Sequence, residues 1–317
     1  MRPRPNPLGC RHAWPVLCQI DCDKEPELYT LLSVGPGEEA QIGPGPQEYS
    51  CVVVEGRLRI TGFAFIEAPV IVIGATGVID GSGRGRSGGS DGGDGHSIHG
   101  RGSGGAGGSG VCRGGPSAEL KDATEGAQPG RQDSNLEAAG ASGGNGGDLQ
   151  GLGGLGAAGG ASLHLLAHRC VLSGRIDLSG GRGDTPMDSD GGGGGGGAAG
   201  NLQIACARAE LHLQNLRLLA NGGAGGDGGT TSDKEAIYTG GGGGGGAGGL
   251  MRLSFTAVEL LTPMRSTEIS SSAVLYQRLE GHISVRGGLG GEQGETGSPS
   301  ERGRDGETCQ VEVRVGP

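Results

Sequence analysis

The sequence "GGGGGGGAAGNLQIAC" at residues 191–206 contains a run of glycine that passes directly into alternating apolar residues. Leu202, Ile204 and Cys206 occupy every second position after the run. A period of two indicates a β-strand with one buried face. The same succession returns 49 residues later, 240 against 191, as "GGGGGGGAGGLM" at residues 240–251. The repetition predicts a repeat architecture in which glycine runs feed successive strands.

Two further copies of this unit flank the pair. "ASLHLLAHRCVLSGRIDLSGG" at 161–181 follows a shorter glycine stretch, and "TCQVEVRVGP" at 308–317 forms a truncated last copy. A short apolar strand that ends in a glycine-rich turn and an acid also recurs, at 174–184, 215–227 and 281–292, and more loosely at 75–85. The predicted unit is therefore strand, turn, strand, glycine-rich excursion and return to the next strand.

The composition decides how such a chain folds. Of 317 residues, 76 are glycine, and there are only three Phe, four Tyr and one Trp. Glycine loses more backbone entropy on ordering than other residues, so a folded state needs dense backbone hydrogen bonding. The alternatives are a flexible glycine-rich coil or close-packed repeats in which only glycine fits.

Glycine falls at every third residue of the excursions, for example at 222, 225 and 228. A polyproline-II helix has three residues per turn and places such glycines along one edge. Proline is scarce in most excursions and the series are short, which argues against a collagen triple helix. We therefore expect an all-β fold, a parallel β-helix or solenoid with long glycine-rich, polyproline-II-like excursions.

The domain organisation follows from the distribution of glycine. Residues 1–28 are predicted to form an N-terminal segment or cap, and residues 29–317 the glycine-rich β-solenoid. The β-branched runs at 48–83 contain little glycine and are expected to be the first coils. The polar stretch 113–140 is expected to be a surface loop.

The order "VIVIGATGVIDGSGRG", then "GGGGGGGAAGNLQI" and "GRIDLSGGRG", resembles the glycine-rich parallel β-helix proteins of the pectin-lyase-like type. These occur among surface and secreted proteins of plants, protists and bacteria. The resemblance covers about residues 48–317. It implies a right-handed β-helix with glycine-rich loops, an extracellular or cell-surface location and, for most members, no established enzymatic activity. This chain is short for the family and begins without a clear signal peptide.

Charge, hydropathy and cysteine content limit the classes of function that the chain can have. The net charge of −10 argues against nonspecific binding to nucleic acid. The sequence has no apolar run of 18 residues, so no membrane span is predicted. Eight cysteines permit disulfides in an oxidising compartment. Cys170 and Cys206 lie in apolar strand-like runs, where buried free thiols are expected.

Two groups of residues have the composition of a chemical site. Asp91, Asp94, His96 and His99 are potential ligands of a divalent metal, but a glycine-rich loop offers no fixed second shell to orient them. We therefore predict no metal and no cofactor. The second group is formed by acids on the short strands, among which Asp177 is expected to project outward from its strand.

Asp80 occupies the comparable place to Asp177 in another copy, but the remaining two copies carry Leu218 or Ser284 nearby. Glycoside hydrolysis needs two carboxylates held at a fixed distance. No ladder of acids is evident, and we predict no catalytic residue.

Arg182, Gly183 and Asp184 form the tripeptide that many matrix proteins offer to adhesion receptors. The same strand-to-excursion turn recurs in "GGAGGD" and "GGLGGE", so the acid belongs to the repeat. We interpret the tripeptide as a marker of the repeat and keep it as a speculative ligand turn.

Three functional hypotheses remain. The first is a noncatalytic structural or surface protein built on the solenoid, with self-association as a further expectation. The second is a carbohydrate- or receptor-binding module, with cell-surface or wall polysaccharide as the partner. The third is a polysaccharide-active enzyme, which has the least support because the acids do not align between copies of the repeat.

Overall fold

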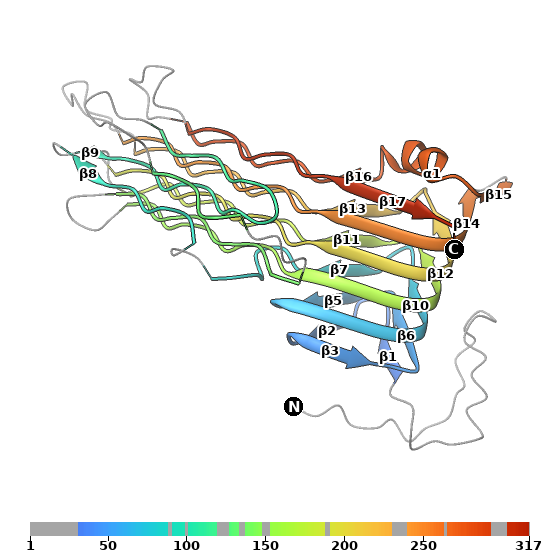
Figure 1. Ribbon diagram of the computed structural model, residues 1–317. Coiled ribbons are helices and arrows are strands. Elements are labelled where there is room, and N and C mark those ends of the chain that lie inside the picture. The colour runs from blue at the N-terminus through green and yellow to red at the C-terminus, as the bar shows by residue number, and fades with distance from the viewer. Residues whose placement is uncertain are drawn as a thin grey trace.

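The structure is a computed structural model, and it describes residues 31–87, 91–98, 101–118, 127–132, 137–147, 153–187, 191–229, 240–262, 265–292 and 303–316. These residues form β-strands and one α-helix, so the predicted all-β class with parallel strands is confirmed. The strands of the two larger sheets gather at one end of the molecule, and glycine-rich segments run side by side away from them (Figure 1). The predicted cap at residues 1–28 lies outside the described residues.

The large sheet has nine strands, and all its neighbouring strands are parallel except the last pair. Its main path is β1 (Leu31–Val34), β4 (Cys51–Val54), β6 (Phe63–Ile73), β10 (Ser162–Leu172), β12 (Leu202–His212), β14 (Met251–Thr262) and β15 (Arg265–Ile269). Two more strands pair off this path, β3 (Gly45–Glu48) with β6 and β17 (Val311–Val315) with β14.

The small sheet has six strands, also paired in parallel. Their order is β16 (Ile283–Ser284), β13 (Arg217–Leu219), β11 (Arg175–Asp177), β7 (Val78–Asp80), β5 (Arg57–Ile60) and β2 (Glu39–Ile42). A separate antiparallel pair, β8 (Ser97–Ile98) and β9 (Arg101–Gly102), lies within the longest excursion.

The chain passes alternately through the two sheets. β6 is followed by β7, β10 by β11 and β12 by β13, and each long strand pairs with the long strand of the next passage. Leu202 lies opposite Met251 in the register, so the 49-residue offset of the sequence repeat is the offset between paired strands.

The apolar core lies between the sheets. Ile66, Leu165, Ile204 and Leu253 stand in register on four neighbouring strands of the large sheet, and all are almost fully buried. The small sheet contributes inward residues such as Ile176 to the same cluster. Each such side chain stabilises the fold by about 1.5–3 kcal/mol through burial. The predicted inward faces of the long strands are thereby confirmed.

In each long strand, the alternation of buried and outward residues shifts by one position near the middle of the strand. In β12 the buried positions are Leu202, Ile204 and Cys206, and they continue at Ala209 and Leu211 after a step of three. Figure 1 shows the ribbons of the long strands curving toward one end. The change of phase keeps both halves of the bent strand facing the core.

The expectation of free thiols at Cys170 and Cys206 was wrong, because the two form a disulfide with a Cα–Cα distance of 6.1 Å. The register places Cys170 opposite Ala209 and Cys206 opposite Ala167, so the cysteines are not cross-strand partners. The change of inward phase brings both into the core, on either side of the bend. Such a crosslink typically stabilises a fold by about 2–4 kcal/mol.

The excursions leave and return at one edge of the sheets. Outgoing segments 178–187, 220–229 and 285–292 follow strands of the small sheet, and returning segments such as 191–201 and 240–250 precede strands of the large sheet. Together with the described parts of 81–161 and with 303–310, they form the glycine-rich bundle. A second disulfide, Cys112–Cys309, links the first excursion to the last.

Returning segment 191–201 lies in the interior of this bundle. Its amide groups donate in three series of three-residue steps, each series to a different neighbouring segment. Gly193 and Gly196 donate to segment 240–250, while Gly194 donates to Asp184 at 2.9 Å. The third series donates to segment 137–147 through Gly192, Gly195 and Ala198. Because all three series are enclosed, every residue of the run is buried.

Glycine is required in this run by space. A Cβ placed on any of Gly192–Gly197 would overlap a backbone carbonyl of a neighbouring segment. The successive positions meet three different neighbours in turn, so no position of the three-residue period leaves room for a side chain. This explains the uninterrupted glycine run.

Outgoing segment 220–229 lies on the outside of the bundle. Gly222, Gly225 and Gly228 donate to segment 285–292, and Gly223, Gly226 and Gly229 donate to segment 191–201. The third series, Asn221, Ala224 and Asp227, carries side chains. Of these two segments, the outer one therefore has glycine at two positions in three and the inner one has an uninterrupted glycine run.

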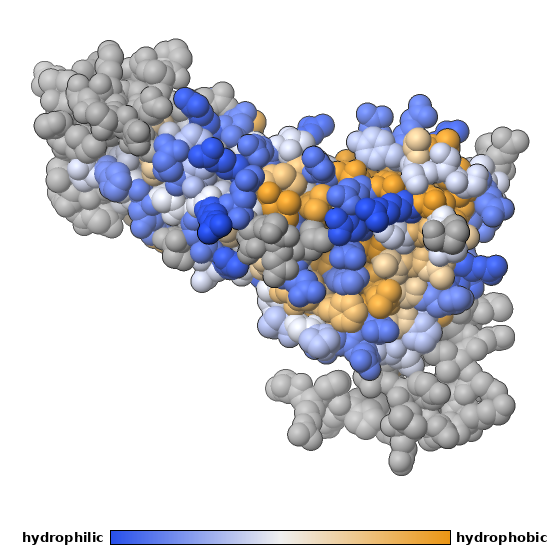
Figure 2. Space-filling model, viewed as in Figure 1, coloured by the Kyte–Doolittle hydropathy of each residue, from blue (hydrophilic) through white to orange (hydrophobic). Residues whose placement is uncertain are grey.

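The predicted surface loop 113–140 is only partly described. Gly115 and Ala118 are buried, and their amides donate to Gly245 and Gly242 of the bundle. Hydrophilic residues cover much of the bundle, whereas apolar residues gather over the sheets (Figure 2).

The helix α1 (Ser272–Leu279) buries Leu275 and Leu279 at the β15 and β17 end of the large sheet. In the part of the chain that the structure describes, no helix has the length and apolarity to cross a membrane.

Candidate ligand-binding face

The outer surface of the small sheet continues directly onto the outgoing segments. In the strands every second residue faces outward, and in the segments every third residue does. We call this surface the polar face. It comprises Arg57, Arg59, Val78, Asp80, Arg175, Asp177, Ser179, Arg182, Arg217, Leu219, Asn221, Ala224, Asp227, His282, Ser284, Arg286, Leu289 and Glu292.

Side-chain hydrogen bonds join neighbouring segments of the chain on the polar face. The Ser284 hydroxyl donates to Asn221 Oδ1 at 2.7 Å, and the amide of Arg286 donates to the same oxygen at 3.0 Å. On the other side, the amide of Asn221 donates to Ser179 Oγ at 3.3 Å. These bonds join three neighbouring segments where the sheet passes into the bundle.

The tripeptide Arg182-Gly183-Asp184 lies in an outgoing segment. Gly183 is buried and donates its amide to Ala224 at 2.9 Å. Arg182 belongs to the polar face and pairs with Asp227 at 3.0 Å. Asp184 is exposed, but it lies in a different series and its amide donates to Leu155. Both charged side chains are open to solvent, while the backbone between them is fixed by the bundle.

Asp80 and Asp177 stand directly opposite each other in the register, on β7 and β11. Asp80 Oδ1 accepts hydrogen bonds from the amide and hydroxyl of Ser82, and Asp177 Oδ1 accepts one from the amide of Ser179. Arg57 lies 3.7 Å from Asp80 Oδ2, and Arg175 pairs with Asp177. Both carboxylates are thus occupied in turns and ion pairs, as a structural role requires.

Three of the four residues weighed as metal ligands, Asp91, Asp94 and His96, are described, and each has its own surroundings. Asp91 pairs with Arg86 at 3.8 Å. Asp94 Oδ1 accepts a hydrogen bond from the amide of Asn145 at 2.8 Å. His96 is exposed, and His99 lies outside the described residues. Within the described ranges, no three His, Cys, Asp or Glu residues are grouped closely enough to hold a metal ion.

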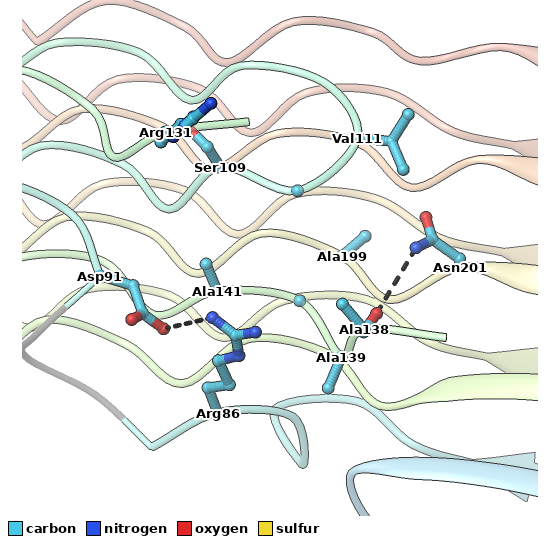
Figure 3. Close-up of a pocket in the computed structure, with 12 residues that line it drawn as sticks. Arg86, Asp91, Ser109, Val111, Arg131, Ala138, Ala139, Ala141, Ala199 and Asn201 are labelled. Carbon is cyan, nitrogen blue, oxygen red and sulfur yellow. Dashed lines mark hydrogen bonds and ion pairs between the residues drawn. The ribbon is translucent and has the colours of Figure 1, made fainter. Parts of the chain in front are cut away.

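A pocket of about 190 Å³ lies where the bundle meets the sheets. Alanine side chains and Val111 form its apolar wall, and Arg131 lies at its edge (Figure 3). Asn201 donates to the Ala138 carbonyl at 3.5 Å and accepts from the amide of Leu250. The volume of this pocket is below the roughly 300 Å³ at which small-molecule pockets begin. The side chain of Asn201 joins neighbouring segments through these hydrogen bonds.

Sequence reasoning missed a second row of acids, on the large sheet. Glu210, Glu259 and Glu268 stand in register on β12, β14 and β15. Glu210 accepts a hydrogen bond from Arg169 Nε at 2.9 Å, and Glu259 accepts one from Ser266. The signal lay in the equal distance of Glu210 and Glu259 from the start of their strands.

His164 lies on the outer side of the large sheet, with its ring edge-on to Phe65 at a centroid distance of 4.8 Å. Burial lowers the pKa of His164, and the nearby carboxylates of Glu137 and Glu67 oppose the shift. Its Nε2 atom is buried and makes no hydrogen bond with another described residue. The neutral ring is therefore favoured in the folded protein.

Comparison of the chain with family models, curated proteins and solved structures found no match. Charged side chains stand in register on the polar face, where Asp80 lies opposite Asp177 and Arg175 opposite Arg217.

Proposed function

We propose that the two sheets are two faces of a parallel β-solenoid, in which each coil contributes a strand to both sheets, as in the pectin-lyase-like proteins that the sequence resembles. We further propose that the glycine-rich segments are polyproline-II helices. The alternating passage of the chain and the register between passages support the solenoid. Hydrogen bonds that recur at every third residue match the three residues per turn of the polyproline-II helix.

On this fold, the protein is a noncatalytic structural or surface protein, in which the sheets form a base and the bundle a stiff projection. The hydrogen bonding of the interior segment 191–201 carries this proposal, because segments bonded on all sides resist bending. The disulfides Cys112–Cys309 and Cys170–Cys206 support an extracellular or cell-surface location, since disulfides persist in oxidising compartments.

Distance measurement by pulsed electron paramagnetic resonance tests the stiffness. The spin labels are placed at Arg278 of α1 and at Met187, which is 98% exposed near the end of its outgoing segment. They are attached to noncanonical residues, so that the cysteines do not react. The expected result is a single narrow distance distribution, as narrow as that of a control pair at Arg278 and Arg208. A broad distribution for the first pair alone contradicts the proposal.

The noncatalytic part has its own test. Incubation of the protein with plant and algal polysaccharides is expected to release no reducing ends. Release above that of heat-denatured protein favours the polysaccharide-active enzyme instead. That alternative has less support, because Asp80 and Asp177 are engaged in turns and ion pairs.

A carbohydrate- or receptor-binding module is the second candidate function, and the polar face favours it. The outward amides of Ala224 and Leu289 make no backbone hydrogen bond with other described residues. Together with the guanidinium groups they present donors on one surface, which suits an extended chain rich in oxygen acceptors. A glycan array is expected to show binding that Arg217→Gln weakens, and an unchanged array profile contradicts this candidate.

A further inference from the structure

One row of the polar face contains three arginines. Arg57 on β5 and Arg175 on β11 both stand opposite Val78 of β7, and Arg175 stands opposite Arg217 of β13. His282, next to Arg217, extends the row toward β16. Because neighbouring strands lie about 4.8 Å apart, the three arginines lie within about 15 Å along a line across the strands. All three are exposed.

The row is incompletely neutralised. Arg57 faces Asp80 and Arg175 pairs with Asp177, but Arg217 forms no ion pair with a described carboxylate. Its Nη1 donates to the carbonyl of its neighbour Leu216 at 2.6 Å and lies 3.0 Å from His282 Nδ1.

Like charges directly opposite each other on paired strands are destabilising, and Arg175 and Arg217 are such a pair. A bound anion relieves this repulsion. The protein as a whole carries a net charge of −10, so a row of cations is a local exception.

The chemistry of the row selects the ligand. A guanidinium group offers several N–H donors in a planar fork, which matches the oxygens of sulfate and carboxylate groups. The ion pairs of Arg57 and Arg175 are solvent-exposed, since half of each arginine side chain is accessible. Exposed pairs are worth little, so their remaining donors stay open to a ligand.

We propose that the row of Arg57, Arg175 and Arg217 binds an anionic polysaccharide, a chain with sulfate or carboxylate groups that lies across the strands of the small sheet. The inference rests on the second candidate function and names its ligand class. The acidic end of the polar face, with Asp227 and Glu292, is outside this site.

The test measures binding of the full chain to three immobilised polysaccharides: heparin, polygalacturonate and neutral dextran. Arg217→Gln removes the charge for which no described carboxylate forms an ion pair. Arg208→Gln is the matched control, because Arg208 is also exposed and also stands opposite an arginine, Arg169, but on the large sheet. Circular dichroism checks that each variant is folded, and Arg217→Lys restores the charge without the fork.

The proposal expects binding to heparin, to polygalacturonate or to both, at low salt, and no binding to dextran. Arg217→Gln is expected to weaken that binding about 5- to 20-fold and to reduce its dependence on salt by about one cation contact, with Arg217→Lys between the two. Equal losses for Arg208→Gln and Arg217→Gln overturn the site.

The heparin and polygalacturonate arms distinguish sulfate from carboxylate as the recognised group. Equal binding to dextran overturns the anionic ligand but leaves carbohydrate binding as a function. If none of the polysaccharides binds, the proposed ligand class falls, while the structural function keeps its own test.

Discussion

Residues 191–200 and strand β12 at 202–212 follow each other in the chain but pack by opposite means. β12 buries Leu202 and Ile204 in an apolar core, whereas the preceding segment is buried without any side chain larger than a methyl group. In the first region side-chain volume fills the interior, and in the second hydrogen-bonded backbone fills it. The same substitution, to alanine, is therefore expected to harm both regions for contrary reasons.

Removing volume from the sheet core has the largest expected effect. Ile204→Ala leaves a cavity beside Leu165 and Leu253, its register neighbours, and is expected to lower the free energy of unfolding by about 2–5 kcal/mol. Denaturant unfolding followed by circular dichroism measures the loss. Gln203→Ala, one residue earlier and facing outward, is the control and is expected to change stability by less than about 0.5 kcal/mol. Equal effects contradict a side-chain core.

Adding volume to the bundle has the next largest effect. A Cβ on Gly196 overlaps the carbonyl oxygen of Gly223, so Gly196→Ala is expected to lower the free energy of unfolding by about 1–3 kcal/mol. Gly110→Ala is the matched control, because its nearest neighbour would be the Ala199 oxygen at 3.8 Å. Both substitutions restrict the unfolded chain equally, so the difference between them measures the overlap. Equal stability of the two variants refutes close packing.

The elements that the sequence predicted are those set by local pattern. Alternation after the glycine runs located β10, β12, β14 and β17, and the 49-residue offset of the repeat equals the offset between paired residues of β12 and β14. The three-residue period of glycine also corresponds to the period of the hydrogen bonds.

Features that depend on tertiary geometry were not predicted from the sequence. The Cys170–Cys206 disulfide depends on the bend of the long strands, because the register sets these cysteines three positions apart. The helix α1 was missed, although Leu275 and Leu279 are one helical turn apart, because it interrupts a strand repeat. The arginine row was missed because it joins strands from four passages of the chain.

A smaller effect concerns pH. Burial lowers the pKa of His164 from 6.5, so the unfolded chain binds the proton more readily than the folded one. The free energy of unfolding is therefore expected to fall as the pH drops below about 6.5 toward the pKa of the folded state. His164→Gln removes this part of the slope, as unfolding at a series of pH values between 7 and 5 measures. An unchanged slope in the variant contradicts the lowered pKa.

The smallest effect is expected at the tripeptide. Asp184→Glu keeps the charge and the backbone hydrogen bonds of the segment, and attachment of cells to a surface coated with the protein is expected to stay unchanged. Loss of attachment restores Arg182-Gly183-Asp184 as an adhesion ligand. Unchanged attachment leaves it as a marker of the repeat.

Amide hydrogen exchange distinguishes a hydrogen-bonded bundle from a flexible coil, because it detects the hydrogen bonds of the bundle residue by residue. Continuous protection is expected over Gly192–Gly200. In 220–229 we expect protection of two amides in three, with rapid exchange at Ala224 and Asp227, whose amides donate to no backbone oxygen of the described residues. Rapid exchange throughout both segments, with the strands still protected, would show a flexible glycine-rich coil and contradict a bundle held by its backbone.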